Sequence, residues 1–220
     1  MARMYYKGTL SKDKYFDSFE SLEASLKTSV EKAGLDEKDY MTPISILYLM
    51  WSGFKRESLP TVCKEDISET FNSVYDLKAA TTRNVQPNVI KHLSKHAQEP
   101  IFFNMSNASP YLLRTRVSYC MTETAVHNCI YNFNSLLKEA GVSYSSEAIY
   151  ESGLFSRAFE LQKSGFVFPI YHRNRALSDE GWRTYEQIFE RKFSSTNSIT
   201  NYVLKFEAWV RLFYEVYYES

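Results

Sequence analysis

The clearest hydrophobic pattern in the chain lies in its last twenty-five residues, from Thr196 to Ser220, which contain neither proline nor glycine. Apolar side chains recur there at steps of three and four residues, which is the spacing of one helical face. Further apolar positions widen this stripe to more than half of the circumference, so the helix must be buried on several sides or lie in an interface. The stripe consists of Ile199, Tyr202, Val203, Phe206, Trp209, Val210, Leu212, Phe213, Val216 and Tyr217.

The same periodicity predicts helices along most of the chain. The first spans residues 17–33 and ends at Gly34, a typical C-terminal stop. Thr42 followed by Pro43 predicts the start of a central buried helix that continues to residue 54. Further helices are expected over residues 62–79, 88–98, 110–140 (with a weak point at 122–124), 145–164 and 178–193.

About eight helices without a run of alternating strands predict an all-α protein. We expect one compact globule, a single helical domain over residues 17–220, with a weak seam near 99–110. Prolines border two short stretches, near residues 101–105 and 166–171, that are expected to be extended.

Residues 1–16 form an N-terminal arm that is both basic and aromatic. Its four basic residues against Asp13 give a net charge of +3, and four aromatic rings are interleaved with them. Such ends fray unless something holds them. We expect the arm to contain little of the core and to join copies of the chain together with the C-terminal helix. The residues predicted for this self-association are Tyr5, Tyr6, Trp209, Tyr214 and Tyr218.

Composition narrows the class of protein. Aromatic residues make up 16% of the 220 residues, which predicts a core built largely on rings. The formal net charge of zero excludes a global electrostatic attraction to nucleic acid or membranes. The three cysteines form no metal-ligand spacing, and no apolar run is long enough for a signal peptide or a membrane span. These features predict an intracellular, cytoplasmic protein.

Charge is distributed unevenly along the chain, and this is the main indication of function. Residues 83–116 have a net charge of +4, whereas residues 57–76 have −4. Such segregation suits head-to-tail stacking of copies or a polyanion on one face, although a solvated surface would also account for it. Aromatic rings beside arginines are typical of single-stranded RNA sites. The candidate RNA-binding residues are Arg83, Lys91, Lys95, Arg114, Arg116, Arg173, Arg175, Tyr111 and Tyr171.

No pattern for a metal, a cofactor or a catalytic residue is found. His92 and His96 stand four residues apart, a spacing that can chelate zinc. However, Leu93 takes the place of the glutamate of metalloproteases, and neighbouring lysines repel a cation, so a solvated basic face is expected. The chain lacks a glycine-rich phosphate loop and a Gly-x-Ser-x-Gly motif.

Arg116 and His127 provide one link to an enzyme class. An arginine and a histidine on helices resemble the pair of the HEPN-type ribonucleases, which implies metal-independent RNA cleavage. Ten residues separate the pair here, more than in the HEPN motif, and this departure puts their joint action in doubt.

The preferred hypothesis is a non-enzymatic helical assembly protein, an oligomeric single-stranded RNA-binding subunit of the coat or nucleocapsid kind. The first alternative is a helical adaptor that binds a protein partner through the aromatic C-terminal helix. The second alternative is the HEPN-like ribonuclease.

Overall fold

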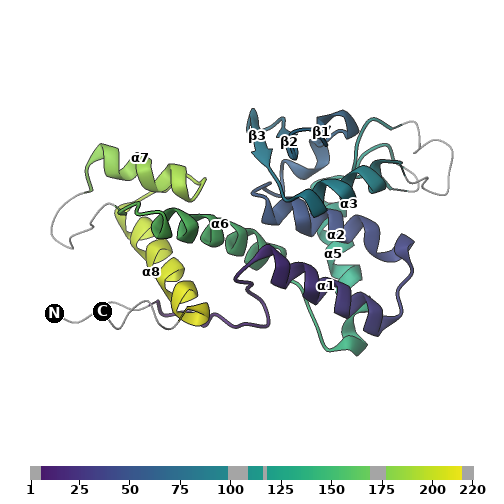
Figure 1. Cartoon of the computed structure of the whole chain (residues 1–220), viewed down its shortest axis with the longest axis horizontal. Helices are drawn as coiled ribbons and strands as arrows, with labels where there is room; N and C mark the ends of the chain where they lie inside the picture. Colours follow the sequence, from purple (N-terminus) through teal and green to yellow (C-terminus); the bar gives the residue numbers. More distant parts are fainter. Residues whose placement is uncertain (1–5, 99–108, 116–117, 169–176, 215–220) are drawn as a thin grey trace.

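The chain is mostly helical, as predicted. The computed structural model describes residues 6–98, 109–115, 118–168 and 177–214, and these contain seven α-helices and one small antiparallel sheet (Figure 1). The helices are α1 (Phe19–Ala33), α2 (Glu37–Trp51), α3 (Pro87–Gln98), α5 (Glu123–Leu136), α6 (Ser146–Lys163), α7 (Asp179–Ile188) and α8 (Thr196–Phe213). The strands are β1 (Ile67–Ser68), β2 (Ser73–Asp76) and β3 (Thr81–Asn84).

Serine caps begin four of the helices, close to the predicted starts at residues 17, 145, 178 and 196. The side chains of Ser18, Ser145, Ser178 and Ser195 each accept a hydrogen bond from a backbone N–H in the first turn that would otherwise have no partner. Gly34 ends α1 in the left-handed conformation, which glycine adopts without a steric cost. These ends are local features, so the sequence was sufficient to predict them.

The central buried helix begins earlier than predicted. α2 starts at Glu37 after Asp36, and Pro43 lies inside the helix rather than at its first position. Glu37 and Asp39 in the first turn favour this start, because acidic side chains stabilise the positive end of a helix. The prediction of burial is confirmed, since every residue from Pro43 to Trp51 is buried.

The helix predicted over 62–79 is wrong, because this region forms the sheet. β2 pairs with β1 and β3, and Val74 lies opposite Arg83. Val74 and Asp76 are buried while Tyr75 between them is exposed, which is the two-residue alternation of a strand. The helical spacing that included Phe71 was coincidental, since Phe71 is 78% exposed near the β1–β2 turn.

The helix predicted over 110–140 is confirmed only in its second part. Thr122 caps α5, so the weak point at 122–124 is where the helix begins. Leu112 and Leu113 before it are buried, and their backbones bond to Val62 and Met121 instead of forming a turn of helix. The expected extended stretch near 101–105 lies outside the described residues, as does the part of 166–171 after Phe168; residues 166–168 are irregular.

The buried apolar side chains form two clusters joined by α6. The N-terminal core gathers side chains from α1, α2, α3 and α5. The C-terminal core gathers side chains from α6, α7 and α8. α6 contributes to both cores, with Ile149 in the first and Ala148 and Phe155 in the second. Figure 1 shows α6 running between the two groups of helices. The single domain over 17–220 remains a prediction, and residues 99–108 of the expected seam lie outside the described residues.

The C-terminal core is built on aromatic rings, as the composition predicted. The ring of Phe155 lies 5.4 Å from that of Tyr202, 5.7 Å from that of Phe206 and 6.0 Å from that of Trp209, measured between centroids. Phe189 packs edge-on against Phe155 from the end of α7. Such offset and tilted contacts are the preferred geometry of aromatic pairs.

The N-terminal arm contributes to both cores, and the expectation that it contains little core is wrong. Tyr15 is buried in the C-terminal core and Phe16 in the N-terminal core. The hydroxyl of Tyr15 donates to Glu151 at 2.9 Å, and the Phe16 amide donates to Ser152 Oγ at 3.1 Å. The carbonyl of Phe16 accepts from the indole N–H of Trp209 at 3.2 Å. Tertiary packing therefore fixes the end of the arm on α6 and α8.

Candidate functional site

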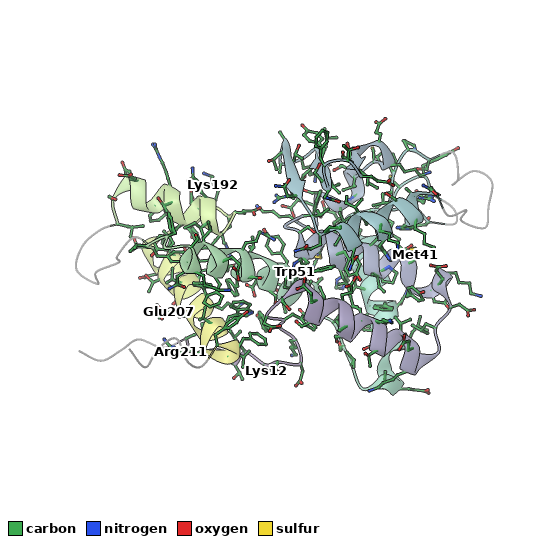
Figure 2. The ribbon with its side chains drawn as sticks, in the orientation of Figure 1. Lys12, Met41, Trp51, Lys192, Glu207 and Arg211 are labelled. Carbon is green, nitrogen blue, oxygen red and sulfur yellow. The ribbon has the colours of Figure 1, made fainter. Side chains whose placement is uncertain are left out.

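A cleft of about 770 Å³ lies where the two groups of helices meet. Its walls are the start of α1, the end of α2, the segment between β3 and α3, and one side of α6. Trp51 at the end of α2 lies at this junction (Figure 2). The charged and large aromatic residues of its lining include Asp17, Glu20, Trp51, Arg157, Glu160 and Tyr214.

The floor of the cleft depends on a close crossing of α2 and α6 at Gly153. A Cβ atom at this position would lie 2.0 Å from the carbonyl oxygen of Trp51, far inside van der Waals contact. The same carbonyl accepts a hydrogen bond from Nη1 of Arg157 at 2.9 Å. Glycine here therefore allows the two helices to approach, and Arg157 bonds to the end of α2.

The cleft is acidic. Asp17, Glu20 and Glu160 line it, and Glu20 and Glu160 are exposed. Arg157 is the one basic residue among the described lining residues, and its charge is paired with Glu190. Glu160 pairs with Lys163 at 2.7 Å, so Asp17 and Glu20 are the carboxylates that favour a basic occupant. Trp51 and Tyr214 add aromatic surface to the lining.

A partly buried ion cluster of Asp76, Arg83, Arg157 and Glu190 lies beside the cleft. Arg83 donates from Nε to Asp76 at 3.1 Å and from Nη1 to Glu190. Glu190 also accepts from Nη2 of Arg157 at 3.4 Å. The cluster joins β2, β3, α6 and the segment after α7, so it links the two groups of helices. Arg157 and Glu190 were not predicted as site residues, because no local sequence pattern indicates a contact between residues so far apart.

The described part of the predicted RNA-binding set does not form one exposed groove. Arg83 lies in the ion cluster with 11% of its side chain exposed. Arg114 is 2% exposed and donates to the carbonyls of Leu112 and His96. Tyr111 is half-buried in a bridge with Cys63. Both arginines therefore bond within the protein, contrary to the expectation. Arg116, Tyr171, Arg173 and Arg175 lie outside the described residues.

Lys91 and Lys95 are the exposed members of this set. They stand one turn apart on α3 and line a shallow pocket of about 340 Å³ with Ser94, Gln98 and Glu69. Lys95 also forms an ion pair with Glu37. The structure thus brings two predicted basic residues together at the surface.

His92 and His96 are not on a solvated basic face, and that expectation is wrong. His96 is 1% exposed, and its two ring nitrogens bond to Ser45 Oγ at 2.8 Å and Thr42 Oγ1 at 3.2 Å. Nε2 of His92 lies 3.1 Å from both the Met41 carbonyl and Ser45 Oγ. Burial and then the nearby charge of Arg114 lower the pKa of His96 to about 3, and burial lowers that of His92. Both imidazoles are polar links between α2 and α3.

The buried histidines predict a loss of stability in mild acid. The unfolded chain takes up a proton at His96 near pH 6.5, whereas the folded chain does not until the pH approaches 3. The contribution of His96 to stability is therefore complete above pH 6.5 and is lost as the pH falls below it. Between these values the free energy of unfolding should fall by about 1.4 kcal/mol per pH unit as pH decreases. Urea unfolding at pH 7, 6 and 5 measures this slope.

The exposed His127 provides the control for this experiment. The His127→Gln variant should keep the wild-type slope, and His96→Gln should reduce it. An unfolding free energy that is constant from pH 7 to pH 5 would contradict the assignment.

The residues predicted for self-association differ in how far they are buried. Trp209 is fully buried, so the expectation that it contacts another copy is wrong for the folded chain. Tyr214 is half-buried and stacks on Phe159 with the ring centroids 4.4 Å apart. Tyr6 is half-buried, and Tyr5 and Tyr218 lie outside the described residues.

The described residues contain no group of three or more His, Cys, Asp or Glu side chains that could hold a metal ion. His127 is exposed on α5, and the Arg116 of the HEPN comparison lies outside the described residues. None of the described helices has the length and apolar character needed to cross a membrane.

Comparisons with known proteins add no identity to these observations. No protein-family model matches the chain, and the search of curated proteins finds no match. Function is therefore argued from the site itself.

Proposed function

We propose that the chain is a non-enzymatic helical subunit that associates head to tail with copies of itself. The cleft would receive the basic and aromatic N-terminal arm of a second copy. The observation that carries this proposal is charge complementarity: Asp17, Glu20 and Glu160 line the cleft, and the arm has a net charge of +3. Opposite charges on two surfaces of one molecule favour a heterologous contact, which closes into a ring or continues as a filament.

The arm is suited to this role by the way it is anchored. Tyr15 and Phe16 are buried against α6 and α8 of their own copy, so the chain before them starts from a fixed point. Lys7 and Lys14 are exposed, as is Lys12, whose Nζ lies 5.8 Å from the ring centroid of Phe213. Anchoring lowers the entropy lost when the arm binds a neighbour, because fewer residues remain to be ordered.

Neutralising the cleft should prevent association. We expect Asp17→Asn, Glu20→Gln and Glu160→Gln combined to shift the chain toward its monomer mass of 25.7 kDa. Size-exclusion chromatography with light scattering measures this, and added salt should weaken the wild-type assembly because exposed charges are screened.

The control variant carries the same charge change elsewhere. Glu31→Gln, Glu65→Gln and Glu139→Gln remove three exposed carboxylates away from the cleft and should leave the mass unchanged. A wild-type chain that stays monomeric at every concentration would overturn the proposal of self-association. An assembly unaffected by the cleft variant would overturn the role of the cleft.

Single-stranded RNA binding by the assembled subunit is the second candidate, as in a coat or nucleocapsid protein. Its support is the exposed pair Lys91 and Lys95 on α3. Repetition of such a pair along an assembly would create a basic track, and RNA affinity would fall steeply with salt. The 260/280 nm absorbance ratio of the same chromatographic peak, before and after nuclease, detects bound RNA. The adaptor alternative has less support, since Tyr202, Phe206 and Trp209 of α8 are buried in the chain's own core.

A further inference from the structure

Two arginines from different parts of the fold hold one carboxylate between them. Arg83 is on β3, Arg157 is on α6, and Glu190 follows α7. Oε2 of Glu190 accepts from Arg83, and Oε1 accepts from Arg157 at 3.4 Å. Paired guanidinium groups are the donors that proteins commonly use to bind phosphate, because their fixed N–H directions match its oxygens.

A third donor near these arginines lacks a partner. The hydroxyl of Tyr150 is buried and has no hydrogen-bond partner among the described residues. Burial raises the pKa of Tyr150 to about 12, and the charges of Glu190, Arg83 and Arg157 act on it as well. A buried hydroxyl without a partner is costly, so an unsatisfied one on which the charges of Arg83 and Arg157 act points to an acceptor that binds there.

The backbone at Gly53 packs closely against both guanidinium groups. Gly53 has φ +97°, and a Cβ atom there would lie 2.7 Å from Nη1 of Arg83 and 2.9 Å from Nη2 of Arg157. Glycine is thus required where the backbone meets both guanidinium groups.

Glu190 is the more exposed of the two carboxylates in the cluster. Its side chain is 30% exposed, whereas that of Asp76 is 1% exposed. Glu190 is therefore the carboxylate that can turn toward solvent.

We propose that Arg83, Arg157 and Tyr150 form a phosphate-binding site that Glu190 occupies as an internal competitor. A carboxylate has two oxygens, and both are used by the arginines. A phosphate group has additional acceptor oxygens, one of which would take the Tyr150 hydroxyl. The phosphate could be inorganic or a phosphodiester of nucleic acid. Arg157 also lines the cleft, but phosphate binding at this site does not require the proposed self-association.

Removing the competitor should strengthen phosphate binding. An internal competitor lowers the apparent affinity by the fraction of molecules in which the site is open. We expect Glu190→Gln to bind inorganic phosphate about tenfold or more tightly than the wild-type chain, on this argument. Isothermal titration calorimetry at constant ionic strength, balanced with chloride, measures both dissociation constants. Adding Tyr150→Phe or Arg157→Lys to Glu190→Gln should weaken binding severalfold.

Glu186→Gln is the matched control. Glu186 lies on α7 one turn before Glu190, accepts hydrogen bonds from Lys192 and the Phe193 amide, and has no hydrogen bond to either arginine of the site. Its variant should bind phosphate like the wild-type chain. If Glu190→Gln fails to fold, Glu190→Asp, which is shorter by one methylene, should show the same direction of change.

A second probe identifies the source of the phosphate. A six-nucleotide single-stranded RNA, titrated in the same way, tests whether a phosphodiester can enter. Tighter binding of either probe by the Glu190 variant, lost with the Arg157 change, supports the site. Equal affinity of the wild-type and Glu190 variants for both probes, or binding that survives Arg157→Lys unchanged, overturns it.

Discussion

Replacing Gly153 with alanine is expected to destabilise the fold severely. Alanine at an unobstructed helix position stabilises by about 0.5–1 kcal/mol relative to glycine. Here the new Cβ would lie 2.0 Å from the Trp51 carbonyl oxygen. Because that obstacle is backbone, only separation of α2 and α6 relieves the clash, and such overpacking costs about 3 kcal/mol or more. Thermal unfolding should show Tm lower by about 10 °C for a chain of this size.

A neighbouring position on α6 provides the comparison. Ser156 lies three residues after Gly153 on α6. Ser156→Ala raises the helix propensity at this position and adds no atoms, so the Tm of this variant should equal or slightly exceed that of the wild-type chain. If Gly153→Ala melts at or above the wild-type temperature, the close crossing of α2 and α6 is not present in solution.

Truncating Trp209 to alanine is expected to remove much of the stability of the C-terminal core. The indole is fully buried, contacts the rings of Phe155 and Phe206, and donates to the Phe16 carbonyl. Loss of a buried aromatic of this size costs about 3–5 kcal/mol. That is a large part of the stability of a typical domain, so urea unfolding should begin at much lower concentration.

Two further variants separate the sources of this effect. Trp209→Phe retains a ring but leaves the buried Phe16 carbonyl without its donor, and it should cost about 1–3 kcal/mol. Tyr131→Ala changes a ring that is 67% exposed and should stay within about 0.5 kcal/mol of the wild-type chain. An unchanged unfolding curve for Trp209→Ala, with a changed assembly mass, would instead place Trp209 between copies.

The local features of the sequence predicted the helices well where caps and stops were clear. Ser145 and Ser195 begin helices at the expected places, and Gly34 ends one, because each acts on backbone groups within a few residues. The prediction over 62–79 was wrong because Ile67, Phe71 and Val74 fit a helical spacing as well as separate strands and turns. Because the segment is so short, the pairing of β2 with β3 decides whether it forms a helix or a strand.

The candidate sites were much less accessible to sequence reasoning. The ion cluster joins Asp76 to Glu190, and the cleft joins Asp17 to Tyr214, so both depend on how distant segments pack. The same is true of Arg114 and His96, which look like surface groups in the sequence and are buried side by side.

The sequence by itself determined that this is a mostly helical protein with a ring-rich core and an aromatic final helix, since periodicity, caps and composition act locally. Only the tertiary structure decided which charges face solvent and which face each other. It placed Tyr15 and Phe16 of the arm in the core, and it set Glu190 between two arginines. Burial and charge pairing are properties of neighbours in space, and spacing along the chain does not fix them.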